Sequence, residues 1–284
     1  MSQNISNSIV GTMLIQNKKK TNAIAWIAPV AGILGGFLLW RFGLGADGNF
    51  THPDPAGGFW PQQQGPKWGL ARMYQGGIIV PLLLGALLTV LIFVVERWRT
   101  IGKASGTRPI PQFIRQLQYT LAIDHISTAV RECDIQRGSL GKVIKLGLLR
   151  YQEMASAPLD HKQKLQAIQK DLDEVGSVEL HGMEQNLVFL STIASVATLL
   201  GLLGTVTGMI TSFAALGESG GGEAAQRLSQ GISEALYNTA LGIGTSAVSI
   251  IMYNVFTTRI DAVAQGIQEG AYTLTQSFDS QHAH

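Results

Sequence analysis

Two long apolar segments in the second half of the chain dominate its pattern of hydrophobic and polar positions. The first covers residues 186–213 and the second residues 232–256, and a glycine-rich turn at 217–222 lies between them. Each segment exceeds the roughly 20 apolar residues that a helix needs to cross a bilayer. The pattern therefore predicts two antiparallel membrane-spanning helices joined as a hairpin.

Polar and small residues within the two segments recur at steps of three and four, which places them on one face of each helix. On the first helix this face holds Ser191, Ser195, Thr198, Leu202, Thr205, Gly208 and Ser212. On the second it holds Glu234, Asn238, Gly242, Thr245 and Ser249, with Thr239 and Ser246 at its edge. Thr205 and Glu234 are about equally far from the turn, so we expect them to lie at a similar depth.

Two further segments have the length and composition of membrane spans. Residues 23–40 are apolar and follow the basic triplet 18–20, and residues 76–95 carry no charge. A cleaved signal peptide is the alternative for the first, but its apolar core is usually about 7–15 residues long. We expect a retained anchor, and hence an all-α, multi-pass membrane protein with four transmembrane helices.

The distribution of lysine and arginine predicts the orientation of these spans. Basic residues cluster at 18–20, at 97–108 and at Arg259, and the positive-inside rule places such clusters in the cytoplasm. Both termini are then cytoplasmic, while the loop 41–75 and the glycine turn face outward. The Gly- and Pro-rich residues 46–66 predict an irregular loop. Residues 67–75 predict a short interfacial helix with Trp68 and Tyr74 as belt residues.

Five segments follow from this organisation. Residues 1–65 form an N-terminal extension with the extra span and outer loop. Residues 66–100 hold the interfacial helix and the second span, and residues 101–186 form a helical cytoplasmic domain. The pore-forming hairpin covers residues 187–258, and a C-terminal cytoplasmic helix and tail cover residues 259–284.

Apolar residues in the segment 101–186 are spaced for amphipathic helices, which predicts an all-helical domain. Pro158 separates the last helix from the others, and we expect that helix to run straight into the span that begins at Leu187. The predicted core positions are Ile114, Leu117, Leu121, Leu140, Ile144, Leu148, Tyr151, Leu165, Ile168, Leu172 and Val175.

Composition narrows the functional classes. Charged residues make up 14% of the chain, against about 25% in soluble domains. A net charge of +2 without a basic-aromatic cluster argues against nucleic acid as a partner. Cys133 is the single cysteine, which excludes an intramolecular disulfide and any CxxC site. We find no catalytic spacing among His125, His161 and His181, and we expect no enzyme activity, metal or cofactor.

Glu234 is the candidate functional group of the hairpin. Helical spacing begins near Glu223, so Glu234 lies about three turns inside the second helix. A carboxylate at the bilayer centre costs about 2.5–3.5 kcal/mol on insertion scales and is a functional hypothesis by default. The hydroxyls have a simpler alternative, because Ser and Thr in membrane helices often bond to their own backbone or hold helices together.

Two stretches of the hairpin resemble the paired signatures of a known family. Residues 201–210 read GLLGTVTGMI, residues 231–242 read GISEALYNTALG, and Tyr253-Asn254 follows. These stretches resemble the MotA/TolQ/ExbB proton-channel family, and most closely its ExbB and TolQ branch. The resemblance covers about residues 66–270, including the stretch WGLARMYQGGIIVP that precedes the second span.

The resemblance implies a homopentamer in the inner membrane of a Gram-negative bacterium. The ring would surround an ExbD-like single-span partner with an intramembrane aspartate, and it would drive TonB-type transport with the proton-motive force. By motif position, Thr205, Glu234 and Thr239 would form the proton pathway. Ser191, Ser195, Thr198, Asn238, Thr245 and Ser249 are pore-lining candidates, and Gly201, Gly204, Gly208 and Gly242 are candidates for helix packing.

The chain departs from the family pattern in three places. Thr198 and Val248 stand where the family often has proline, and the first 65 residues have no counterpart in three-span members. A TolQ-like envelope motor and a flagellar-type stator remain alternatives within the same class. A non-conducting membrane scaffold is the alternative from another class, although it has little use for Glu234. The cargo and the choice between protons and sodium stay open.

Overall fold

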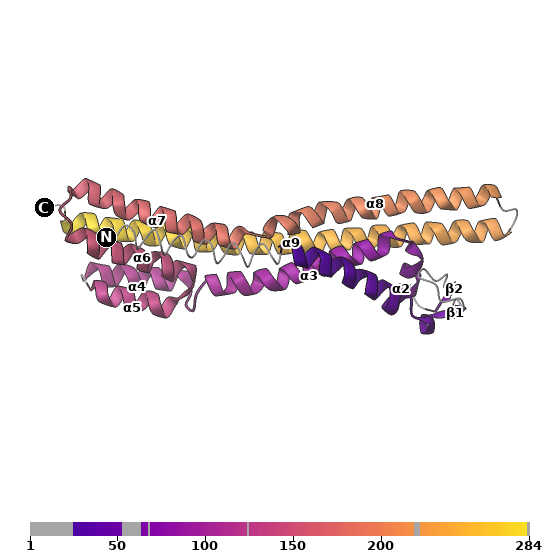
Figure 1. Ribbon diagram of the computed structural model, residues 1–284, viewed down its shortest axis with the longest axis horizontal. Helices are drawn as coiled ribbons and strands as arrows, with labels where there is room; N and C mark the ends of the chain where they lie inside the picture. The colour runs from indigo at the N-terminus through magenta and orange to yellow at the C-terminus, as the bar shows by residue number, and fades with distance from the viewer. Residues whose placement is uncertain (1–24, 53–63, 68, 124, 219–221, 283–284) are drawn as a thin grey trace. The chain divides into compact units, whose positions relative to one another are not determined.

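The computed structural model describes residues 25–52, 64–67, 69–123, 125–218 and 222–282, most of which are helical. They form two compact units. The apolar unit contains residues 25–95 and 188–253, and the polar unit contains residues 96–187 and 254–282. Helices α3 (Ile79–Ala104) and α9 (Gly222–His282) contribute residues to both units (Figure 1).

The described residues confirm the all-α class and the number of spans. Four helical stretches are long and apolar enough to cross a membrane. They are Ala25–Leu44, Ile79–Ala104, His161–Gly217 and Ala224–Ser280.

The first of these helices packs closely against α3 through glycines. Its α-helical part covers residues 25–38, and the π-helix η1 (Leu39–Leu44) extends it past the predicted end at Trp40. A Cβ atom placed on Gly36 would lie 2.6 Å from the Cα of Gly85 and 2.7 Å from the carbonyl oxygen of Pro81. Gly32 and Gly36 form a small-xxx-small pair, the spacing that lets two membrane helices approach closely.

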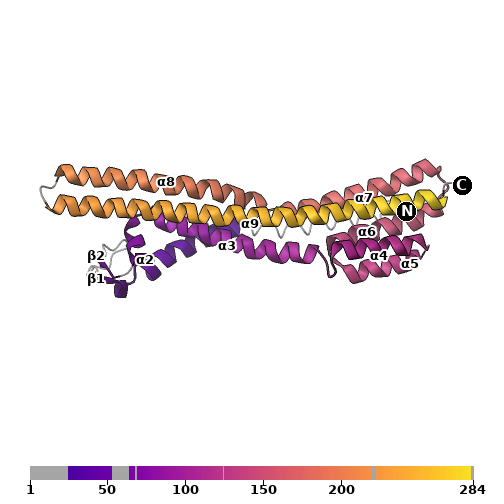
Figure 2. The same cartoon turned by 180° about the vertical axis from the view of Figure 1, so that it is seen from behind.

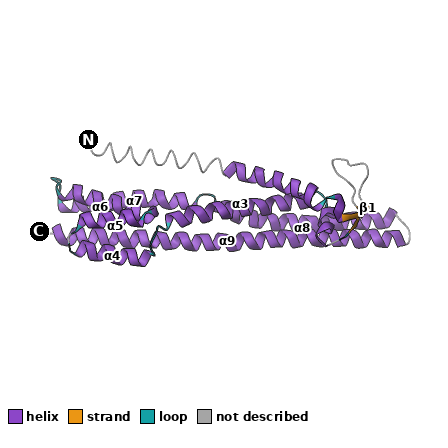
Figure 3. Ribbon diagram, turned by 90° about the horizontal axis from the view of Figure 1, so that it is seen from below, coloured by secondary structure: helices purple, strands orange, loops and turns teal. Residues whose placement is uncertain are grey.

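The outer loop is more ordered than the sequence indicates. The 3-10 helix η2 (Asp47–Asn49) leads into strand β1 (Phe50–His52), which pairs antiparallel with β2 (Gln64–Pro66). Figure 3 shows β1 in orange beside the helices. The prediction of an irregular loop over 46–66 was therefore wrong at both ends of that range. This part of the loop is ordered because side chains next to the strands are buried, and such burial cannot be predicted from local composition.

An aromatic cluster anchors this loop. Trp40 stacks on Tyr74 with ring centroids 4.5 Å apart and donates a hydrogen bond from Nε1 to the Tyr74 carbonyl at 3.1 Å. Phe50 meets Tyr74 edge-on. Tyr74 is buried, so its predicted place in an exposed interfacial belt was wrong. Trp68 lies outside the described residues. The predicted interfacial helix appears as two short pieces, α2 (Gly69–Arg72) and η3 (Met73–Gly76).

The polar unit is a helical bundle. Its helices are α4 (Ile110–Ala122), α5 (Ile126–Gln136), α6 (Gly138–Ala155) and α7 (His161–Glu184), together with the end of α9. Figure 2 shows this group around α9. Pro158 lies between α6 and α7 as predicted. Leu165 and Val175 are half-buried, and the other nine predicted core positions are buried, which confirms the helical faces.

Helix α7 does not continue straight into α8 (Leu187–Glu218), so that prediction was wrong. The helix ends at Glu184, and Asn186 has a left-handed backbone with φ of 66°. Arg97 of α3 compensates for the break. Its Nη1 donates to the carbonyl of Gln185 at 2.5 Å and of Met183 at 3.3 Å, and its other nitrogens pair with Glu96.

Candidate functional site

Helices α8 and α9 of the apolar unit meet along a seam of small residues. A Cβ atom on Gly242 would lie 2.6 Å from the carbonyl oxygen of Ala197 and 2.8 Å from the Cα of Gly201. One on Gly208 would lie 2.9 Å from the Cβ of Ala235. The two backbones are thus as close as glycine allows, and this closeness brings short polar side chains of both helices into contact.

Thr205 and Thr239 form the central polar contact of the seam. Their hydroxyls hydrogen-bond to each other, and Thr239 Oγ1 also lies 3.1 Å from the carbonyl oxygen of Gly201. Thr205 Oγ1 lies 3.3 Å from the same carbonyl oxygen, and each hydroxyl carries one hydrogen, so one hydroxyl donates to the other while the second donates to Gly201. Both residues are half-buried at the edge of the seam. The arrangement is a short hydrogen-bonded relay between two helices.

Glu234 lies about one helical turn from this relay. Its neighbour Ala235 contacts Gly208, three residues beyond Thr205 on α8, so Glu234 is closer to the glycine-rich turn than Thr205 is. The expected meeting of Thr205 and Glu234 at one depth is replaced by the Thr205–Thr239 pair. Glu234 is half-buried, and Gln230 Nε2 donates to its carboxylate at 3.1 Å. Between Arg227 and Arg259 it is the one charged residue in the sequence.

The six pore-lining candidates divide into two groups of three. Asn238, Thr245 and Ser249 of α9 are buried inside the chain. Ser191, Ser195 and Thr198 of α8 are exposed on its surface, and each hydroxyl bonds to a carbonyl of its own helix.

The buried group connects α9 to its neighbours. Asn238 Nδ2 donates to the carbonyl of Gly76 at 3.1 Å, and Ser249 Oγ donates to the carbonyl of Leu190 at 2.6 Å. Neither bond is visible in the sequence, because its partners are 162 and 59 residues apart. The apolar face of α9 is exposed, as expected for a surface that meets lipid or another subunit. It consists of Leu236, Ile243, Ala247, Ile250 and Ile251.

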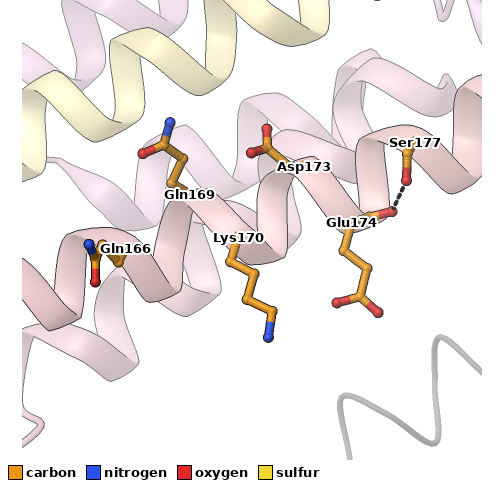
Figure 4. A pocket seen from close by; sticks show the side chains of 6 residues that line it. All are labelled: Gln166, Gln169, Lys170, Asp173, Glu174 and Ser177. Carbon is orange, nitrogen blue, oxygen red and sulfur yellow. Dashed lines mark hydrogen bonds between the residues drawn. The ribbon is translucent and has the colours of Figure 1, made fainter.

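The described residues offer no competing site. A surface hollow of about 620 Å³ lies along α7, and Figure 4 shows that its side chains point in different directions. It is lined by Gln166, Gln169, Lys170, Asp173, Glu174 and Ser177. Over the described ranges, no group of three or more His, Cys, Asp or Glu side chains could hold a metal ion.

Comparison with known proteins agrees with the geometry of the hairpin. The sequence profile of the MotA/TolQ/ExbB proton channel family matches residues 139–269, which include the whole of the seam. The match covers 131 of the 284 residues and identifies this part of the chain as a region of the MotA/TolQ/ExbB type. This is a channel family whose members act as transport components rather than enzymes.

Curated relatives carry both names of the branch. The Tol-Pal system protein TolQ of Haemophilus influenzae is 39% identical over 88 residues, which are 31% of this chain and 38% of the relative. A putative biopolymer transport protein ExbB homolog of Methanothermobacter thermautotrophicus is 30% identical over 158 residues, 52% and 55% of the two chains. The biopolymer transport protein ExbB of Helicobacter pylori is 35% identical over 96 residues, 34% and 65%.

The matched part of the chain spans between 38% and 65% of the length of these three relatives. Identities of this size do not separate ExbB from TolQ. The comparisons therefore identify the family of the matched region, and the system that the protein serves is a separate question.

Proposed function

We propose that this chain is an ExbB-like subunit of an inner-membrane motor that uses the proton-motive force to energise TonB-dependent transport across the outer membrane. Glu234 carries the proposal. It lies about three turns into α9, in a stretch that is otherwise uncharged from Arg227 to Arg259, and one turn from the Thr205–Thr239 relay. Carboxylates inside membrane spans commonly belong to proton relays, and here the carboxylate lies close to a pair of hydrogen-bonded hydroxyls.

A TolQ-like role in envelope maintenance is the second candidate. It is favoured by the relative named TolQ, which is 39% identical over its matched region. The ExbB assignment is favoured by relatives that carry that name, including one matched over 52% of this chain. The two roles share the ion path and differ in the partner that the motor drives.

The exposed hydroxyls of α8 support an oligomer. Ser191, Ser195 and Thr198 form a polar stripe on a helix whose other exposed side chains are mostly apolar. In a ring of copies this stripe would line a shared lumen instead of facing lipid. We propose a homopentamer around an ExbD-like single-span partner with an intramembrane aspartate, and a TonB-like protein as the driven component.

The test uses Glu234→Gln and Glu234→Asp in strains that lack their own ExbB or TolQ. Gln keeps the size and hydrogen bonding of the neutral acid but cannot exchange a proton, so we expect intact assembly and no energy-dependent uptake. Asp retains the carboxylate one methylene further back, so partial uptake is expected. Glu269→Gln is the matched control, because Glu269 is an exposed carboxylate on the same helix.

Two readouts separate the candidates. Restored TonB-dependent uptake supports the ExbB-like role, and restored outer-membrane integrity in the strain without TolQ supports the other. Full uptake by the Glu234→Gln variant would remove Glu234 from the mechanism, and with it the main argument for a proton path.

We also propose that all four spans are retained and that both termini are cytoplasmic. The close packing of Gly36 on Gly85 and the buried Trp40 support a permanent first helix. In a Cys133→Ser background, Gly48→Cys should react with an impermeant thiol reagent added to spheroplasts, whereas Ser156→Cys should not. Gly48 is exposed, and a Cβ there meets no atom within 4 Å, so the substitution is tolerated sterically. A mature chain that begins near residue 47, or labelling of Ser156→Cys instead, contradicts this topology.

A further inference from the structure

Two buried polar atoms in the membrane hairpin have no hydrogen-bond partner. They are Oδ1 of Asn238 and Oγ1 of Thr245, and within the described part of the apolar unit no other buried side-chain oxygen or nitrogen is in this state. The two residues are 3% and 1% exposed. Inside a membrane an unpaired polar atom cannot turn to bulk water, so each of these atoms requires a partner that none of the described residues supplies.

Asn238 is held in a slot made by two glycines. Its Nδ2 donates to the carbonyl of Gly76, just before α3 begins. A Cβ atom on Gly76 would lie 2.8 Å from Oδ1, and one on Gly204 would lie 2.9 Å from Nδ2. Only glycine at both positions leaves room for the amide, which is thereby fixed between Gly76 and Gly204 with Oδ1 buried.

Thr245 departs from the usual behaviour of threonine in a membrane helix. Thr192 and Thr198 bond to the carbonyl four residues earlier, which satisfies the hydroxyl locally. Thr245 makes no such bond although its hydroxyl is buried. It follows Asn238 by seven residues, which is about two turns on the same helical face, and Glu234 precedes Asn238 by four. The three residues therefore form one stripe of α9.

We propose that Asn238 and Thr245 bind ordered water inside the subunit, and that this hydrated site continues the proton route from Glu234 along α9. Water supplies the donor that Oδ1 needs and the partner that the Thr245 hydroxyl lacks, as buried waters commonly do for polar groups without a protein partner. The route differs from the Thr205–Thr239 relay, whose hydroxyls already bond to each other and to Gly201. The binding of water stands alone, while its part in proton movement rests on the proposed function.

Thr245→Val tests the site because it removes the hydroxyl and keeps the shape. If the Thr245 hydroxyl has no bound water, Thr245→Val removes a buried polar atom that has no hydrogen-bond partner. The melting temperature of the purified complex then stays the same or rises. If the hydroxyl holds water, the variant melts at a lower temperature and energy-dependent uptake falls several-fold. Thr245→Ser keeps the hydroxyl and should restore both. Thr192→Val is the matched control, since that exposed hydroxyl bonds to the carbonyl of Val188 at 2.8 Å.

Radiolytic footprinting in ¹⁸O-water gives a readout that does not depend on activity. Leu241 lies between the two residues on α9, so bound water should label it in the wild-type complex and label it less in Thr245→Val. An unchanged or higher melting temperature, or no ¹⁸O on Leu241, overturns the water site. Full uptake by Thr245→Val overturns its part in proton movement. The proposed function fails separately, through uptake by Glu234→Gln, so the two failures are distinguishable.

Discussion

Arg97 gives the sharpest prediction for the stability of the fold. It is a charged side chain that is only 1% exposed, and its guanidinium binds two backbone carbonyls where α7 ends. The same group pairs with Glu96, whose side chain is 18% exposed. Arg97→Met removes every donor while keeping an unbranched apolar chain of similar reach. The change therefore isolates the hydrogen bonds and the charge from the packing.

The expected cost follows from these contacts. Breaking a buried ion pair by removing one partner costs about 3–5 kcal/mol. Glu96 keeps some access to solvent, so we take the lower end, about 3 kcal/mol for the whole change. For a chain of this size each kcal/mol shifts the melting temperature by about 2–4 °C, so the complex should melt roughly 6–12 °C lower.

Thermal unfolding of the detergent-purified protein measures the shift, and hydrogen exchange shows where it acts. Amides of residues 183–190 should exchange faster in Arg97→Met, because the end of α7 loses its partner. Arg99→Met is the control: Arg99 is exposed two residues later, and a surface change of this kind stays within about 0.5 kcal/mol. Equal melting temperatures for the two variants, with unchanged exchange at 183–190, would refute the role given to Arg97.

Three further predictions concern the seam and the polar unit. Thr205→Val should leave assembly intact and lower uptake, because it removes the hydroxyl that bonds to Thr239. Thr207→Val should change uptake little, because the exposed Thr207 hydroxyl bonds only within its own helix. Equal losses of uptake in the two variants would show that the residues of α8 are assigned to the wrong faces. Gly242→Ala should destabilise the hairpin by about 1–3 kcal/mol, since its Cβ would overlap the Ala197 carbonyl, and an undiminished yield of folded complex would contradict this. Burial raises the pKa of Cys133 from 9.0 to about 12, with nearby Asp134 adding to the shift. Because this pKa is higher in the folded protein, the thiol ionises at a lower pH in the unfolded chain than in the folded one. The contribution of the neutral, buried thiol to folding stability is therefore complete below pH 9 and is lost as the pH rises towards 12. Maleimide should accordingly label it only on unfolding, and rapid labelling of the folded protein at pH 8 would disprove its burial.

The sequence alone determined the features that depend on local pattern. Apolar length identified four spans, and steps of three and four identified which residues share a face of each hairpin helix. The same periodicity correctly predicted the core of the polar unit, from Ile114 to Leu172. Glu234 was recognisable as the one charged residue between Arg227 and Arg259. These inferences hold because a helix fixes the relative directions of its side chains whatever surrounds it.

The tertiary structure decided how those faces meet. Periodicity placed Thr205 and Glu234 on facing helices, but the rotation of each helix depends on where its glycines pack, and that packing joined Thr205 to Thr239. The bond from Asn238 to Gly76 and the contact of Arg97 with the end of α7 join residues 162 and up to 88 positions apart. The break at Asn186 was missed because helical spacing continues through it in the sequence. Such contacts arise from close packing between distant segments, which no local pattern encodes.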